Sequence, residues 1–270
     1  MKIPSLTIKQ LLEAGVHLGH KTFRWNPKMS KFIFGSKDSI HIIDLVQTLE
    51  LTKVALQEIH KCVSAGGKIL FVSTKKQASD TVSALAKDTS QFYVNHRWLG
   101  GMLTNWKTIS NSIKRYKRLG EELKKENTGF TKKEILKMNI QKDKLERSLG
   151  GIAEMKKTPD MIFIIDTNIE SLAVKEAHKL NIPIVAVVDT NSNPTGINFP
   201  IPGNDDARRA INLYCELIKE TIVDAQKNIL EKAPDSESLE KEKDQKKMDN
   251  KKLNENNIKV KTEIKSKKKE

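Results

Sequence analysis

The chain has 270 residues, of which 48 are Lys or Arg and 34 are Asp or Glu, giving a formal net charge of +14. This length accommodates one large α/β domain with appendages, and the positive charge favours a polyanionic partner such as nucleic acid. No run approaches the roughly 18 apolar residues of a membrane-spanning helix, and the start lacks a signal-peptide core. We therefore expect a cytoplasmic protein with no membrane partner. Cys62 and Cys215 fit no CxxC pattern and imply no disulfide framework.

Residues 1–38 are expected to form a basic N-terminal arm. Thr7 is a candidate helix cap, and Leu11, Leu12 and Val16 follow on one side of the predicted helix. Basic and aromatic residues then alternate, a mixture suited to phosphate contacts beside a stacking surface. The candidate RNA-binding residues of the arm are Lys21, Arg24, Trp25, Lys28 and Lys31. The alternative for Trp25 is that its ring only packs the arm onto the domain.

Four short apolar runs rich in β-branched residues predict parallel strands that are buried on both faces. The runs are 69–72, 92–94, 161–165 and 184–188. Apolar residues at helical spacing lie between Leu45 and Val63, before the first run, and between Leu172 and Leu180, after the third. This alternation predicts an α/β domain over residues 1–232 with a doubly wound sheet.

Residues 104–150 form an insertion between the second and third predicted strands. Apolar positions recur at heptad-like spacing from Ile109 to Leu123 and from Ile135 to Leu149, which predicts an antiparallel coiled-coil hairpin. Thr131 and Glu134 predict a capping box at the start of the second helix, after a turn at 128–130. Each helix carries one narrow apolar seam, so we expect the hairpin to reach outward without packing on the sheet.

The insertion contains 13 Lys and Arg but only 6 Asp and Glu, which favours RNA binding over a face that only keeps the protein soluble. In and just before it, the candidate RNA-binding residues are Arg97, Trp98, Lys107, Lys114, Arg115, Lys117 and Arg118. The tail, 233–270, has no apolar periodicity and is expected to be disordered.

Doubly wound sheets bind ligands at the carboxyl ends of their strands, so the residues there bear on enzymatic function. The turn at 73–77 has no glycine, which argues against a phosphate-cradling loop. Asp166 and Asp189 follow the third and fourth strands and could serve an enzyme that acts on RNA or nucleotides. A simpler explanation is that both residues form turns and helix caps.

The same edge could hold a metal ion. His17 with Asp189 and Asp205 or Asp206 could converge there and bind zinc, although His17 and His20 at a spacing of three are a weak signal alone. The acids at 205 and 206 are otherwise explained by a helix that starts there. The sequence predicts no other cofactor.

Several segments resemble the bacterial small-subunit ribosomal protein S-two family. They are 14–20, 24–29, 40–45, 95–105, 159–168 and 188–207, and they occur in order within about residues 10–225. Ser73 and Ser192 depart from the family pattern, where glycine and cysteine are usual, and the tail is idiosyncratic.

The resemblance implies a flavodoxin-like sheet with a protruding coiled-coil hairpin and a structural, non-catalytic role in the small ribosomal subunit. It also implies contacts with ribosomal RNA and neighbouring ribosomal proteins, and a part in recruiting the large mRNA-capturing protein S-one. We therefore expect a structural constituent of the small subunit in the bacterial cytoplasm, rather than an enzyme.

Overall fold

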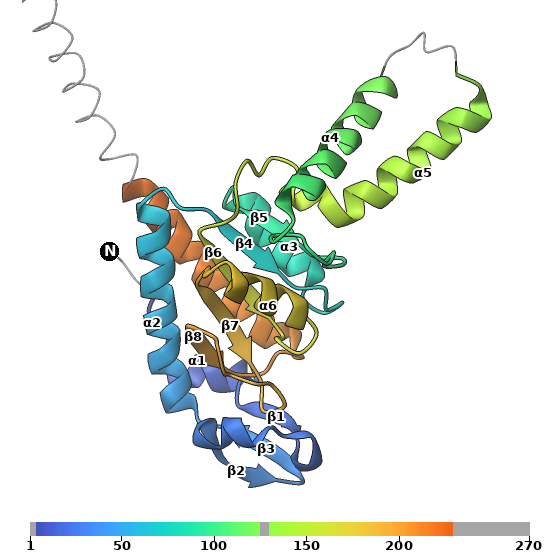
Figure 1. Ribbon diagram of the computed structural model, residues 1–270. Coiled ribbons are helices and arrows are strands. Elements are labelled where there is room, and N and C mark those ends of the chain that lie inside the picture. The colour runs from blue at the N-terminus through green and yellow to red at the C-terminus, as the bar shows by residue number, and fades with distance from the viewer. Residues whose placement is uncertain (1–3, 125–129, 229–270) are drawn as a thin grey trace, which may run out of the picture. The chain divides into compact units, whose positions relative to one another are not determined.

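A five-stranded parallel sheet organises the computed structural model, which describes residues 4–124 and 130–228 (Figure 1). Its strands lie in the order β5-β4-β6-β7-β8, which is the order of flavodoxin-like doubly wound sheets. The bounds are β4 (Ile69–Val72), β5 (Phe92–Val94), β6 (Met161–Ile165), β7 (Ile184–Val188) and β8 (Phe199–Pro202). The predicted fold class is confirmed. The expected domain limit at residue 232 and the tail at 233–270 lie outside the described residues.

Helices cover both faces of this sheet because each strand sends alternate side chains to opposite sides. Phe71 of β4 belongs to one apolar cluster, whereas Leu70 and Val72 belong to the other. The first cluster includes α2 (Leu45–Ser64), α3 (Ser79–Asp88) and the helical segment that begins at residue 208. The second includes α6 (Ser171–Lys179) and the segment that leads into the hairpin. None of the helices in the described ranges is long and apolar enough to cross a bilayer.

The fifth strand, β8, was not predicted. It contains Pro200 and Pro202, which lack the backbone N–H that a central strand needs. These prolines are tolerated because β8 lies at the edge of the sheet, paired only with β7.

The N-terminal arm and the strand that follows it form a small separate sheet, which was also not predicted. After α1 (Ile8–Glu13), strands β1 (Leu18–Lys21), β2 (Ile33–Lys37) and β3 (Ile40–Ile43) pair antiparallel in the order β1-β3-β2. Thr7 caps α1 as predicted, and Leu11 is buried, but Leu12 is exposed. Asp38 and Ser39 both have positive φ, as a two-residue hairpin turn between β2 and β3 requires.

Helices α4 (Trp106–Glu122) and α5 (Lys132–Leu149) form the insertion and lie side by side (Figure 1). The Thr131 capping box is confirmed, whereas most of the predicted turn lies outside the described residues. The expectation that the hairpin reaches outward without packing on the sheet is wrong at the hairpin root. Ile109, Ile113 and Leu149 are buried in the apolar cluster that contains Leu70, so the hairpin root belongs to the core. Coiled-coil packing farther along the two helices stays a prediction.

A buried carboxylate fixes the segment that leads into α4. Glu176 of α6 accepts hydrogen bonds from Trp98 Nε1 at 3.1 Å and from the backbone N–H groups of Gly101, Leu103 and Thr104 at 2.7–3.1 Å. Burial raises the pKa of Glu176, but these donors outweigh burial and lower the pKa overall. The hairpin root is therefore held by one side chain of α6 as well as by apolar packing.

We expect Glu176→Gln to lower the free energy of unfolding by roughly 1–3 kcal/mol, because an amide nitrogen would face donors that a carboxylate oxygen now accepts. The carboxylate's contribution is present above the unfolded pKa of about 4.3 and disappears as the pH falls through the lower folded pKa. Urea unfolding at neutral pH measures the difference. The exposed Glu216→Gln is the control, and equal stability of the two variants would contradict the role of Glu176.

Candidate functional site

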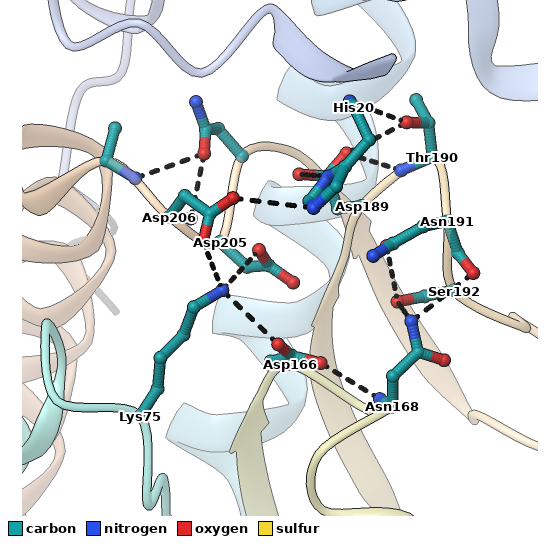
Figure 2. Close-up of polar contacts among 12 residues, drawn as sticks. His20, Lys75, Asp166, Asn168, Asp189, Thr190, Asn191, Ser192, Asp205 and Asp206 are labelled. Atoms are coloured by element: carbon teal, nitrogen blue, oxygen red, sulfur yellow. Dashed lines mark hydrogen bonds and ion pairs between the residues drawn. The ribbon is translucent and has the colours of Figure 1, made fainter. Parts of the chain in front are cut away.

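Lys75 lies at the carboxyl edge of the sheet and joins three of the loops that follow its strands (Figure 2). Its Nζ is 3.2 Å from Asp166 Oδ2, 2.8 Å from Asp205 Oδ1 and 2.6 Å from Asp206 Oδ1. Burial lowers the pKa of this ammonium, but the bonds to Asp205 and Asp206 more than compensate and raise it. A charged side chain thus holds together the loops after β4, β6 and β8.

His20 of β1 reaches the same cluster from the N-terminal arm (Figure 2). Its Nδ1 is 3.0 Å from Asp189 Oδ2, and its Nε2 is 3.4 Å from Asp206 Oδ2. The hydrogen bond with Asp189 is the main cause that raises the pKa of His20. One ligand atom each from His20, Asp189, Asp205 and Asp206 lies within 4.8 Å of all the others.

The histidine in this cluster is His20, and His17, the residue singled out in the sequence, is not part of it. The backbone carbonyl of His17 instead accepts a hydrogen bond from Ile43 N at the end of β3. The backbone N–H of His20 donates to Thr190 Oγ1 at 2.9 Å, which seats β1 on the loop after β7. Gly19 permits this approach, because a Cβ there would lie 2.6 Å from Thr190 Cγ2. The short spacing of His17 and His20 drew attention to both residues, but no sequence pattern predicts the hydrogen bond between His20 and Thr190.

The acids after β6 and β7 have local roles that fit the turn-and-cap explanation. Asp166 Oδ1 accepts the backbone N–H groups of Asn168 and Ile169, and Asp189 Oδ1 accepts that of Thr190. Oδ2 of Asp189 and Oδ2 of Asp205 are both buried. His20 Nδ1 lies 3.0 Å from the Asp189 oxygen, whereas the Asp205 oxygen has neither a hydrogen-bond nor an ion-pair partner among the residues that the structure describes.

The turn after β4 is closed to phosphate. Glu170 Oε1 accepts the backbone N–H of Thr74 at 2.6 Å, so a protein carboxylate occupies a donor that a phosphate loop would offer to its ligand. Burial raises the pKa of Glu170 despite its bonds with Thr74. This agrees with the absence of glycine from 73–77 and argues against a nucleotide-binding site there.

The predicted RNA-binding cations are at the surface. The exposed ones are Lys21, Arg24, Lys28, Lys31, Arg97, Lys107, Lys114, Arg115, Lys117 and Arg118. Trp25 is 40% exposed, and its ring centroid is 5.4 Å from that of His41, so it both packs and presents a surface. Trp98 is not available for stacking, because it is buried and donates to Glu176. Phe23 and Phe34, which are not among the predicted RNA-binding residues, are 74% and 80% exposed.

Asp205 predicts a specific dependence of stability on pH. Burial, followed by the nearby carboxylates of Asp189 and Asp166, raises the pKa of Asp205 to about 7. The folded chain then retains a proton that an unfolded Asp, with a pKa of about 3.9, has released. The free energy of unfolding therefore falls as the pH rises from about 4 to about 7, by up to ~1.4 kcal/mol per pH unit from this group.

We expect Asp205→Asn to flatten this decline, because the amide does not titrate. Urea unfolding in chelator-containing buffers across that pH window measures the slope. The exposed Asp143→Asn should keep the wild-type slope. If the two variants had the same slope, the raised pKa of Asp205 would be wrong.

Comparison with known proteins gives a consistent family. Residues 11–225 match the family model described as Ribosomal protein S2. The small ribosomal subunit protein uS2 of Parvibaculum lavamentivorans is 58% identical over 224 residues, 83% of this chain and 88% of the relative. The proteins of the same name from Chelativorans sp. and Sinorhizobium medicae are 58% and 56% identical, over 83% of this chain and 84% and 88% of their own lengths. The chain therefore belongs to the ribosomal protein S2 family.

Proposed function

We propose that the protein is a structural constituent of the small ribosomal subunit, where it binds ribosomal RNA and neighbouring ribosomal proteins and supports assembly and translation. The observation that carries this function is the match to relatives named small ribosomal subunit protein over 83% of the chain. The protein is not an enzyme, and its place of action is the small subunit in the cytoplasm. The alternative, an enzyme acting on RNA or nucleotides at the sheet edge, is not favoured.

Exposed cations of the arm and the hairpin are the proposed RNA contacts. Lys and Arg neutralise phosphates and release counterions, which makes such binding sensitive to salt. The negative groups of the sheet edge are largely engaged with Lys75, His20 and backbone N–H groups, so they do not pair with these cations. Among the cations, Arg118 pairs with Glu122 on its own helix. This separation of charge supports binding through the surface of the protein.

We further propose that the protein helps to recruit the mRNA-capturing protein S-one, as the family resemblance implies. Exposed aromatic rings suit a protein partner, because aromatic side chains are enriched in protein interfaces. Phe23 and Phe34 of the arm are the most exposed rings among the large apolar side chains that the structure describes.

Replacing Arg24, Lys28 and Lys31 together by Ala should weaken binding to small subunits and reduce the salt slope. Each lost phosphate contact is expected to lower the slope of log K against log [salt] by roughly 0.7–0.9. Subunits that lack this protein, titrated with it at several salt concentrations, give the slope. The matched control removes the exposed Lys53, Lys175 and Lys179, with the same change in net charge. Equal slopes for the two triple variants would rule out the arm as the phosphate-binding element.

We also propose that His20, Asp189, Asp205 and Asp206 hold a zinc ion. Imidazole nitrogen and carboxylate oxygen are ligands that zinc accepts, and four protein ligands suit a structural zinc site. The buried Asp205 Oδ2, which has no donor among the described residues, supports the proposal. The zinc ion would tie the arm to the sheet edge, since His20 comes from β1 and the three acids come from the loops after β7 and β8.

Zinc added after chelator dialysis should raise the melting temperature of the wild-type chain and of His17→Ala. It should leave that of His20→Ala unchanged, because only His20 reaches the three carboxylates. Elemental analysis of the same samples gives the stoichiometry. A zinc response that survives in His20→Ala but disappears in His17→Ala would overturn this ligand assignment.

A further inference from the structure

A groove of about 550 Å³ lies at the hairpin root, bounded by α3, β5, α4 and the segment 150–154. Its volume falls within the roughly 300–1,000 Å³ of typical small-ligand sites. Lys87, Tyr93, Tyr116 and Lys117 bring two phenol rings and two ammonium groups to its lining. Glu154 is the only carboxylate among the lining residues, so the groove has an excess of positive charge.

The ring of Tyr93 is set by close packing on one side. A Cβ at Gly151 would lie 2.1 Å from Tyr93 O and 2.8 Å from the ring atom Cγ, so only glycine lets the backbone approach this closely. Lys87 Nζ is 5.8 Å from the centroid of the same ring. Tyr93 is also partly buried against the first apolar cluster, and the exposed Lys87 lies beside it in the groove lining.

Phenol rings stack on nucleobases, and ammonium groups pair with phosphates. An unstacked nucleotide carries an accessible base and a phosphate close to each other. Single-stranded loops and bulges of RNA supply such nucleotides. Lys117 and Lys114 on α4 continue the positive surface from the groove along the hairpin.

We propose that this groove takes one unstacked nucleotide of ribosomal RNA, with its base against the tyrosine rings and its phosphate beside Lys87 and Lys117. The inference rests on the proposed function and names a subsite within it. Stacking on an aromatic side chain is worth enough that loss of one stacked base weakens binding on the order of tenfold.

The test compares Tyr116→Leu with Tyr116→Phe in the full chain, bound to small subunits that lack the protein. Leu is also a large apolar side chain but has no ring, whereas Phe retains the ring without the hydroxyl. We expect roughly tenfold weaker binding for Tyr116→Leu and wild-type binding for Tyr116→Phe. Chemical probing should show one RNA nucleotide protected in the wild-type and Phe complexes and reactive in the Leu complex.

A second pair of variants changes only exposed side chains. Lys87→Ala with Lys117→Ala should expose the same nucleotide, whereas the control, Lys133→Ala with Lys137→Ala on α5, should not; all four lysines are exposed. A photoreactive phenylalanine at position 116 should crosslink to that nucleotide. A crosslink to protein, or unchanged protection in both Tyr116→Leu and the Lys87 and Lys117 variant, would overturn the inference. If the inference failed in this way, weaker binding by the variant that lacks Arg24, Lys28 and Lys31 would still support the proposed function. Failure of the wild-type chain to bind small subunits would instead contradict the proposed function itself.

Discussion

The ammonium group of Lys75 is the constraint on which the carboxyl edge of the sheet depends. Asp166, Asp205 and Asp206 lie within 3.2 Å of it, and two of these carboxylates are almost fully buried. Like charges that share a poorly hydrated site repel one another strongly unless a cation lies between them. Removing the ammonium would leave buried carboxylates without a counter-charge, which is far more destabilising than the loss of an exposed ion pair. The loops that follow β4, β6 and β8 can therefore converge because the ammonium of Lys75 offsets the repulsion between their carboxylates.

Both proposed RNA-binding elements are attached to the scaffold by polar contacts that the hydrophobic pattern does not encode. Thr190, next to Asp189 at the end of β7, accepts the N–H groups of both His20 and Asn26, which anchors the arm. Glu176 of α6 collects the donors of the segment before α4, which anchors the hairpin. The buried Asp189, Asp205 and Glu176 thus work inside the molecule, while the candidate RNA-binding cations of the arm and the hairpin are exposed where a polyanion can reach them.

The parts of the fold that could be predicted are those with a strong local signal. The four apolar runs correspond to β4, β5, β6 and β7, but β5 lies at the edge of the sheet and is only partly buried, so the expected burial on both faces is wrong for that strand. The Thr131 capping box correctly predicted the start of α5. Strand β8 was missed because its prolines contradict the propensity of a central strand, and the small sheet of the arm was missed because its strands are short and only half buried. The choice of His20 over His17, and the burial of Trp98, depend on contacts between residues more than 70 positions apart. No window of the sequence contains that information.

The carboxylate oxygens at the carboxyl edge of the sheet fall into two sets, so Lys75 and a zinc ion would not bind the same atoms. Lys75 contacts Oδ1 of Asp205 and Oδ1 of Asp206, whereas Asp205 Oδ2 has no hydrogen-bond partner in the described part of the chain. Oδ2 of Asp206 is directed toward His20, as is Oδ2 of Asp189. A metal on the histidine side would therefore use oxygens that the ammonium leaves available, and it would add positive charge to a site where carboxylates outnumber Lys75. The same ion would hold β1 against the loops after β7 and β8. Its binding would therefore stabilise the contact of the basic arm with the sheet domain as well as the loops at the carboxyl edge.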